Sequence, residues 1–118
     1  MKKIGIVGSR RRGDHSDFFL LKEKFKEIYE EGDTLVSGGC PKGGDAFAEE
    51  LAKEGGLTIT IHYPNWNAFH RGAGFVRNTK IAEDCDVLMA LVASDRKGGT
   101  EDTIEKATKL GKKIIVIE

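Results

Sequence analysis

Short apolar segments alternate with amphipathic segments along the whole chain. Five apolar segments have the length of β-strands and cover residues 2–8, 34–38, 57–63, 86–93 and 112–117. Four segments with apolar positions three or four residues apart predict helices over residues 16–32, 45–54, 75–85 and 100–110. Such alternation is typical of parallel sheets with crossover helices on both faces. The pattern therefore predicts a three-layer, Rossmann-like, doubly wound α/β fold with a five-stranded parallel sheet.

The third predicted strand, residues 57–63, differs from the others. Its sequence, LTITIHY, alternates apolar and polar side chains, which indicates one exposed face. A flavodoxin-like strand order, 2-1-3-4-5, would place it at the centre of the sheet, where both faces are covered. We therefore expect the order 3-2-1-4-5, with this strand at an edge.

The expected strand order also predicts where a ligand binds. In open parallel sheets, ligands bind beyond the carboxyl ends of the strands, at the point where the winding reverses. Here that point lies between the first and fourth strands. Three glycine-containing loops follow strands at this edge: GSRRRG (8–13), SGGCPKGG (37–44) and VASDRKGGT (92–100).

Composition argues against several classes of protein. The 118 residues suffice for a single domain over 1–118 with a buried core. Basic and acidic residues both number 19, so no overall positive charge favours nucleic acid. No segment has the length of a membrane span or the pattern of a signal peptide. We expect a cytoplasmic protein without membrane contact.

The cysteines and histidines give no sign of a metal site. Cys40 and Cys85 lack the CxxC spacing of zinc ligands and indicate free thiols in a reducing compartment. The three histidines are not spaced as metal ligands either. We expect neither a metal nor a cofactor.

The loop SGGCPKGGD is the first candidate phosphate site. Glycines between a strand and a helix let backbone amides turn toward an anion, and the helix start adds partial positive charge. Lys42 would add a full charge. The spacing fits neither GxGxxG nor GxxxxGK[ST], and the alternative is a tight turn with Asp45 as the helix N-cap. Cys40 is either a nucleophile or, more simply, a small residue in that turn.

The loop GSRRRG adds fork-shaped donors that suit phosphate or carboxylate. Three consecutive arginines cannot all face one crevice. We expect Arg10, nearest the strand, to contact the ligand together with Ser9, and at least one of Arg11 and Arg12 to be solvated.

Polar residues at two helix starts complete the candidate site. Asn78 shares a helix face with Ile81 and Ala82, and is therefore either a buried hydrogen-bond hub or a ligand contact. In the other helix Thr100 is the expected N-cap, and Asp102 in the first turn suits a sugar hydroxyl better than an anion.

Trp66, the only tryptophan, stands after the third strand. It either stacks on a base or covers the end of the sheet.

Four motifs follow one another along nearly the whole chain: GSR, SGGCPKGGDAFAEELA, PNWNAFHRGAGFVRN and GGTEDTIEKATKLGKKI. In this order and spacing they resemble the SLOG superfamily, the Rossmann-like group that includes the DNA-processing protein DprA/Smf and the Lonely Guy cytokinin-activating enzymes. The small YspA-type branch is the most similar. The resemblance implies a homodimer or larger homo-oligomer and a nucleotide-type ligand. With the loops above, it gives the expected ligand-binding residues Gly8, Ser9, Arg10, Ser37, Gly38, Gly39, Lys42, Gly43, Gly44, Asp45, Asn78, Gly98, Gly99 and Thr100.

The resemblance also bears on catalysis. Lonely Guy enzymes cleave the N-glycosidic bond of a nucleoside monophosphate with an arginine, matched by Arg77, and a glutamate, whose position is held by Thr103. A carboxylate stabilises the oxocarbenium-like transition state of such a cleavage. Without it, Asp102 or Glu101 could take that role only if the start of the helix is rotated.

Three functions follow, and whether the protein is an enzyme stays open. The first is binding of a nucleoside phosphate or an ADP-ribose-like ligand, by a sensor or nucleotide-processing protein. The second is a nucleoside 5′-monophosphate N-glycosidase with Arg77 and Asp102 as catalytic residues. The third is a DprA-like binder of single-stranded DNA, which neutrality and an aromatic content of 8% disfavour.

Overall fold

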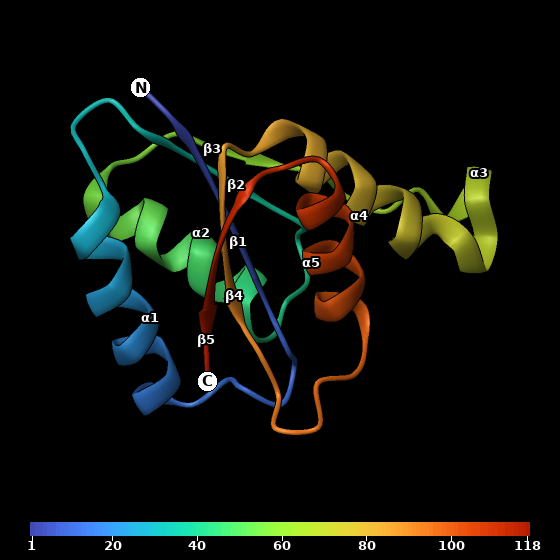
Figure 1. Cartoon of the computed structure of the whole chain (residues 1–118), viewed down its shortest axis with the longest axis horizontal. Coiled ribbons are helices and arrows are strands. Elements are labelled where there is room, and N and C mark those ends of the chain that lie inside the picture. Colours follow the sequence, from blue (N-terminus) through green and yellow to red (C-terminus); the bar gives the residue numbers. More distant parts are fainter.

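The computed structural model describes all residues from 1 to 118 and contains one five-stranded sheet flanked by helices (Figure 1). The strands are β1 (Lys3–Gly8), β2 (Thr34–Ser37), β3 (Ile59–Ile61), β4 (Val87–Leu91) and β5 (Lys113–Ile117). The helices are α1 (His15–Ile28), α2 (Gly44–Gly55), α3 (Trp66–Phe69), the 3₁₀ turn η1 (His70–Gly72), α4 (Ala73–Asp84) and α5 (Gly99–Lys109). All strand pairs are parallel, in the order β3-β2-β1-β4-β5, so the predicted fold and strand order are confirmed.

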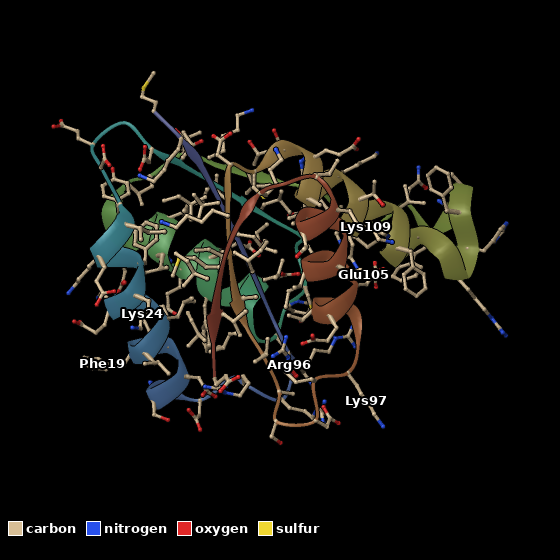
Figure 2. The ribbon with its side chains drawn as sticks, in the orientation of Figure 1. Phe19, Lys24, Arg96, Lys97, Glu105 and Lys109 are labelled. Carbon is tan, nitrogen blue, oxygen red and sulfur yellow. The ribbon has the colours of Figure 1, made fainter.

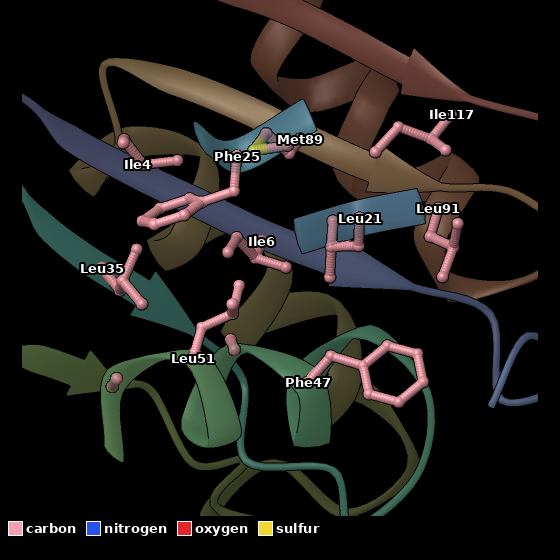
Figure 3. Close-up of a cluster of buried hydrophobic side chains, with 12 residues drawn as sticks. Ile4, Ile6, Leu21, Phe25, Leu35, Phe47, Leu51, Met89, Leu91 and Ile117 are labelled. Carbon is pink, nitrogen blue, oxygen red and sulfur yellow. The ribbon is translucent and has the colours of Figure 1, made fainter. Parts of the chain in front are cut away.

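The sheet is buried between two hydrophobic clusters, because its central strands have both faces covered. In β1, Ile4 and Ile6 belong to one cluster and Val7 to the other. The first cluster packs α1 and α2 against the sheet (Figure 3) through side chains that include Leu21, Phe25, Phe47 and Leu51. The second packs α4 and α5 against the opposite face through Ile81, Ala82 and Ala107. Figure 1 shows the two helix pairs on opposite sides of the strands.

The edge position predicted for the third strand is correct, but the strand is shorter than expected. β3 has three residues, because its only neighbour, β2, has four and pairs with it over residues 35–37. The chain then forms α3, which the hydrophobic pattern does not predict because none of its residues is buried. Asn65 caps this helix by accepting a hydrogen bond from the Ala68 amide at 3.1 Å.

Neither the alternative cap role of Asp45 nor the expected cap role of Thr100 is found. The N-cap of α2 is Gly43 rather than Asp45, and the N-cap of α5 is Gly98 rather than Thr100. Both glycines have positive φ, 71° and 108°, a conformation that favours residues without a Cβ. Asp45 instead turns its carboxylate back toward the loop that follows β2.

None of the helices combines the length and the apolar character that crossing a membrane requires.

Candidate functional site

Two adjoining cavities lie at the carboxyl ends of the strands. The first cavity, of about 450 Å³, lies where β1 and β4 end, at the predicted switch point. The second cavity, of about 480 Å³, lies between the loop after β2 and the start of α4. They share five lining residues and so form one continuous cleft: Arg10, Cys40, Arg77, Asn78 and Gly99.

Most of the expected ligand-binding residues border this cleft. Those lining the first cavity are Gly8, Ser9, Arg10, Asp45, Asn78, Gly98, Gly99 and Thr100, together with Arg77. Gly38 and Gly39 line the second cavity. Those lining neither are Ser37, Lys42, Gly43, Gly44 and Asp102.

The glycines at the start of α2 pack against the first loop. A Cβ at Gly43 would lie 2.4 Å from the carbonyl oxygen of Ser9, and one at Gly44 would lie 2.4 Å from the backbone nitrogen of Gly8. Ser37 is also turned inward, and its hydroxyl donates to the carbonyl oxygen of Ile6 at 3.2 Å. This part of the expected phosphate loop therefore joins β1, β2 and α2 through backbone contacts.

The start of α5 is open in contrast. A Cβ at Gly98 would have no atom within 4 Å, and no side chain caps the helix. The first amides of an α-helix have no acceptor within the helix, and they form its positive end. Gly98, Gly99 and Thr100 line the first cavity, so these amides lie where an anion can reach them.

Basic side chains gather around the first cavity although the chain as a whole is neutral. Arg10 and Lys97 are exposed and have no acidic partner, and Figure 2 shows Lys97 extending from the loop before α5. Arg11 forms a two-pronged ion pair with Asp95, at 2.6 and 2.8 Å. Asp45 is the only acidic residue that lines the cavity.

Arg12 is the arginine of this loop that turns away from the cleft. Its Nε donates to Asp17 at 2.7 Å, and its Nη1 donates to the carbonyl oxygen of Val92 at 2.8 Å. The expectation that the three arginines do not all face one crevice is correct.

Asp45 is a buried carboxylate at the boundary between α2 and the cleft, with an exposed fraction of 7%. It accepts hydrogen bonds from the Cys40 amide at 3.0 Å and the Ser37 hydroxyl at 3.3 Å. Burial raises the pKa of Asp45, while the Cys40 amide, Arg77 at 3.9 Å and the Ser37 hydroxyl oppose that rise.

Arg77 and Asn78 connect three elements across the floor of the cleft. The Nη1 of Arg77 donates to the carbonyl oxygen of Gly38 at 2.6 Å, and its Nε donates to the side-chain oxygen of Asn78 at 2.9 Å. The Nδ2 of Asn78 donates to the carbonyl oxygen of Gly99 at 3.2 Å. Asn78 is therefore a buried hydrogen-bond hub that also borders both cavities.

Asp102 belongs to the same network but lines neither cavity. Its carboxylate accepts from the Nδ2 of Asn78 at 3.1 Å and from the Nζ of Lys106 at 2.8 Å. Thr103, at the position that the family resemblance matches to a catalytic glutamate, lines the first cavity, and its hydroxyl donates to the carbonyl oxygen of Gly99 at 3.2 Å.

The second cavity has an aromatic border. Tyr63, Trp66 and Phe75 line it, with exposed fractions of 66%, 56% and 58%. Tyr63 packs against Gly39, where a Cβ would lie 2.5 Å from the ring. Arg71 also lines this cavity and has no acidic partner.

Several cleft residues are missing from the set expected from the sequence. Arg11 and Lys97 line the first cavity, and Tyr63, Arg71 and Phe75 line the second. Lys97 immediately precedes the glycines of the third expected loop, so its charge could have been included. The aromatic residues carry no such signal, because they come together only when β3, α3 and α4 fold.

Cys40 and the possible metal ligands complete the description of the site. Cys40 borders both cavities, whereas Cys85 is buried in the second hydrophobic cluster. No group of three His, Cys, Asp or Glu side chains is placed to hold a metal ion.

No protein-family model and no curated protein matches the sequence. Among solved structures, the fold is similar to two structures of the molybdenum cofactor carrier protein from Chlamydomonas reinhardtii. One has a TM-score of 0.67 at 20% sequence identity, and the other a TM-score of 0.70 at 22% identity. Each match covers 98% of this chain and 75% of the carrier protein. At this level of identity the similarity establishes a shared fold.

Proposed function

We propose that the cleft binds a phosphorylated nucleotide or nucleotide-like ligand, with a phosphate at the start of α5. The observation that carries this proposal is the local charge of the first cavity. Four basic side chains line it: Arg10, Arg11, Arg77 and Lys97. Arg11 is paired with Asp95 and Arg77 lies 3.9 Å from Asp45, which leaves the charges of Arg10 and Lys97 unpaired in a chain of zero net charge.

The phosphate would contact the open amides of Gly99 and Thr100. Backbone amides at a helix start hold phosphates well, because the donors point outward and the helix dipole adds positive potential. Arg10 and Lys97 would supply full charges without first breaking an ion pair.

Asp45 and Asn78 provide polar groups for a sugar. Each oxygen of the Asp45 carboxylate accepts one hydrogen bond within the protein, which leaves acceptor capacity for a ribose hydroxyl. Both residues line the same cavity as the proposed phosphate site, so one ligand can contact all of these groups.

The structural comparison is consistent with a binding function. The two similar structures carry the name of a cofactor carrier, and a carrier needs a cleft but no catalytic group. N-glycosidase activity has less support, because Asp102 is bound by Asn78 and Lys106 and lines neither cavity.

Isothermal titration calorimetry with inorganic phosphate, ribose 5-phosphate, AMP, GMP and ADP-ribose tests the proposal. We expect the phosphorylated sugars and nucleotides to bind. The Arg10→Ala substitution should lower their affinities about tenfold, as for the loss of a charge-assisted contact. Lys24→Ala on α1, an exposed lysine on another surface (Figure 2), is the control and should leave affinity unchanged.

The absence of any heat or thermal stabilisation with all five compounds at millimolar concentration would contradict the proposed function. Release of free base from AMP or GMP, detected by chromatography after long incubation, would show instead that the bound nucleotide is a substrate and would favour the N-glycosidase.

A further inference from the structure

We propose that the second cavity holds the planar ring of the ligand against Tyr63, Trp66 and Phe75, so that the cleft prefers phosphorylated ligands with an aromatic base to phosphosugars. This inference rests on the proposed function, since it assigns the other half of the same ligand. It restricts the ligand to phosphorylated compounds that carry an aromatic base.

Three large aromatic side chains border one cavity while more than half of each is exposed. Such exposure costs free energy unless a partner covers the rings, and clustered exposed apolar surface marks binding sites. Rings of this kind bind nucleobases by stacking, which works for every base because each has a π-face.

Two of the three rings are held in place by the fold. Tyr63 packs against the backbone of Gly39, which has no side chain to separate them. The backbone of Phe75 is anchored by Lys106, whose Nζ donates to the Phe75 carbonyl oxygen at 2.8 Å and lies 5.6 Å from the ring centroid. Rings that are already positioned lose little conformational freedom when a ligand binds.

The two cavities are connected in a way that suits a nucleotide. Gly99, whose amide belongs to the proposed phosphate site, borders both of them, and so does Arg10. A ligand with its phosphate at Gly99 can therefore extend directly into the second cavity. A phosphosugar would fill the first cavity and leave the aromatic border uncovered.

The charge of the second cavity also suits a base. No carboxylate lines it, whereas the guanidinium groups of Arg10, Arg71 and Arg77 do. Guanidinium groups stack on planar rings and donate hydrogen bonds to their edges. Purine and pyrimidine edges with carbonyl or ring-nitrogen acceptors match these donors.

Trp66 is the only tryptophan, so its fluorescence reports directly on this cavity. Titration with AMP should quench the emission, and titration with ribose 5-phosphate should leave it nearly unchanged. By competition calorimetry we expect AMP to bind about tenfold more tightly than ribose 5-phosphate, as for one stacked base.

Substitutions separate stacking from folding. Trp66→Ala and Phe75→Ala should each reduce the ratio of the AMP and ribose 5-phosphate affinities toward one, while Trp66→Phe should retain most of it. Phe19→Ala removes an equally exposed aromatic residue from α1, outside the cleft, and should leave the ratio unchanged. Unchanged binding of ribose 5-phosphate by each variant would show that the fold and the phosphate site are intact.

The outcomes distinguish the two proposals. Equal binding of AMP and ribose 5-phosphate by the wild-type protein would overturn this inference and leave the proposed function standing. Binding of neither would overturn both. A Trp66→Ala variant that changes the association state in sedimentation experiments, with an unchanged affinity ratio, would also overturn it and indicate a protein contact instead.

Discussion

Helices α2 and α5 start from the same Lys-Gly-Gly sequence but in different surroundings. The second glycine of each sequence, Gly44 or Gly99, is the first residue of the helix, the preceding Gly43 or Gly98 is its N-cap, and neither helix has a side-chain cap. At α2 the two glycines touch the backbone of the first loop, whereas at α5 the corresponding positions face open space or a single amide group at 3.7 Å.

The comparison shows that a glycine-rich helix start can serve packing or ligand binding. At α2 the close approach of two backbones requires glycine, and Asp45 brings a negative charge into the first turn. At α5 the two first-turn acids, Glu101 and Asp102, are engaged by Arg96 and Lys106 outside the cleft. Of these two Lys-Gly-Gly sequences, only the one at α5 lines the cleft.

The largest effect should come from adding a methyl group at the first residue of each helix. Gly44→Ala places a Cβ 2.4 Å from the backbone of Gly8, and should lower the free energy of unfolding by about 3 kcal/mol through overpacking. Gly99→Ala meets nothing closer than 3.7 Å and should change it by less than about 1 kcal/mol. Urea denaturation measures both, and equal losses would refute the distinction between a packed and an open helix start.

The two lysines provide a second pair of matched substitutions. Lys97 lines the first cavity, whereas Lys42 is exposed and lines neither. Lys97→Ala should weaken phosphate-ligand binding about fivefold, roughly 1 kcal/mol, for one partly solvated charge. Lys42→Ala should change affinity less than twofold, and the Lys97 effect should shrink when salt is raised. A larger effect at Lys42, measured by calorimetry, would place the phosphate at α2.

The smallest expected effect is on the pH dependence of stability and concerns Asp45. This acid of the first turn of α2 lines the cleft, whereas the acids of the first turn of α5 do not. Because burial raises the pKa of Asp45, the folded protein holds this proton to higher pH than the unfolded chain does. Asp45 therefore contributes a loss of stability as pH rises from about 4 through its folded pKa. Asp45→Asn should lack that component, so its stability relative to wild type should increase over this pH range in urea denaturation.

Asp33 supplies a control of opposite sign. Burial by itself would raise the pKa of Asp33. Hydrogen bonds to its carboxylate from the Lys2 side chain and from the backbone amides of Lys2 and Glu30 outweigh the burial and lower the pKa to about 2. The stabilisation is present above the unfolded pKa and lost as pH falls toward 2. The Asp33→Asn variant should therefore have a lower free energy of unfolding than the wild type at neutral pH, and the difference should shrink in acid. If the stability difference from wild type changed with pH in the same direction for both variants, the opposite pKa shifts of Asp45 and Asp33 would be contradicted.

The fold could be predicted because its signals are local. The alternation of LTITIHY at residues 57–63 identified an edge strand, and that single observation decided the strand order. The face of α4 that carries Asn78, Ile81 and Ala82 is buried as its spacing predicts. Helix α3 was missed because its side chains are exposed, so it has no hydrophobic periodicity.

The site was less predictable because its character depends on contacts between loops. The sequence placed three loops at one edge of the sheet, and they do border the cleft. The contrast between Gly44 and Gly99 is a matter of what lies opposite each glycine, which the local sequence does not specify. In the same way, Asp102 could be assigned to the cleft until Asn78 and Lys106 were seen to bind it.

The network around Arg77 has a consequence for binding entropy. Two of the five guanidinium N–H groups are used within the protein, on Gly38 and Asn78, which fixes the plane of the group at the junction of the cavities and leaves three donors. A free arginine side chain loses substantial rotational freedom when it is immobilised. For Arg77 this loss belongs to folding rather than to binding, so each hydrogen bond it offers a ligand comes at a smaller entropic penalty than one from the unrestrained Arg10.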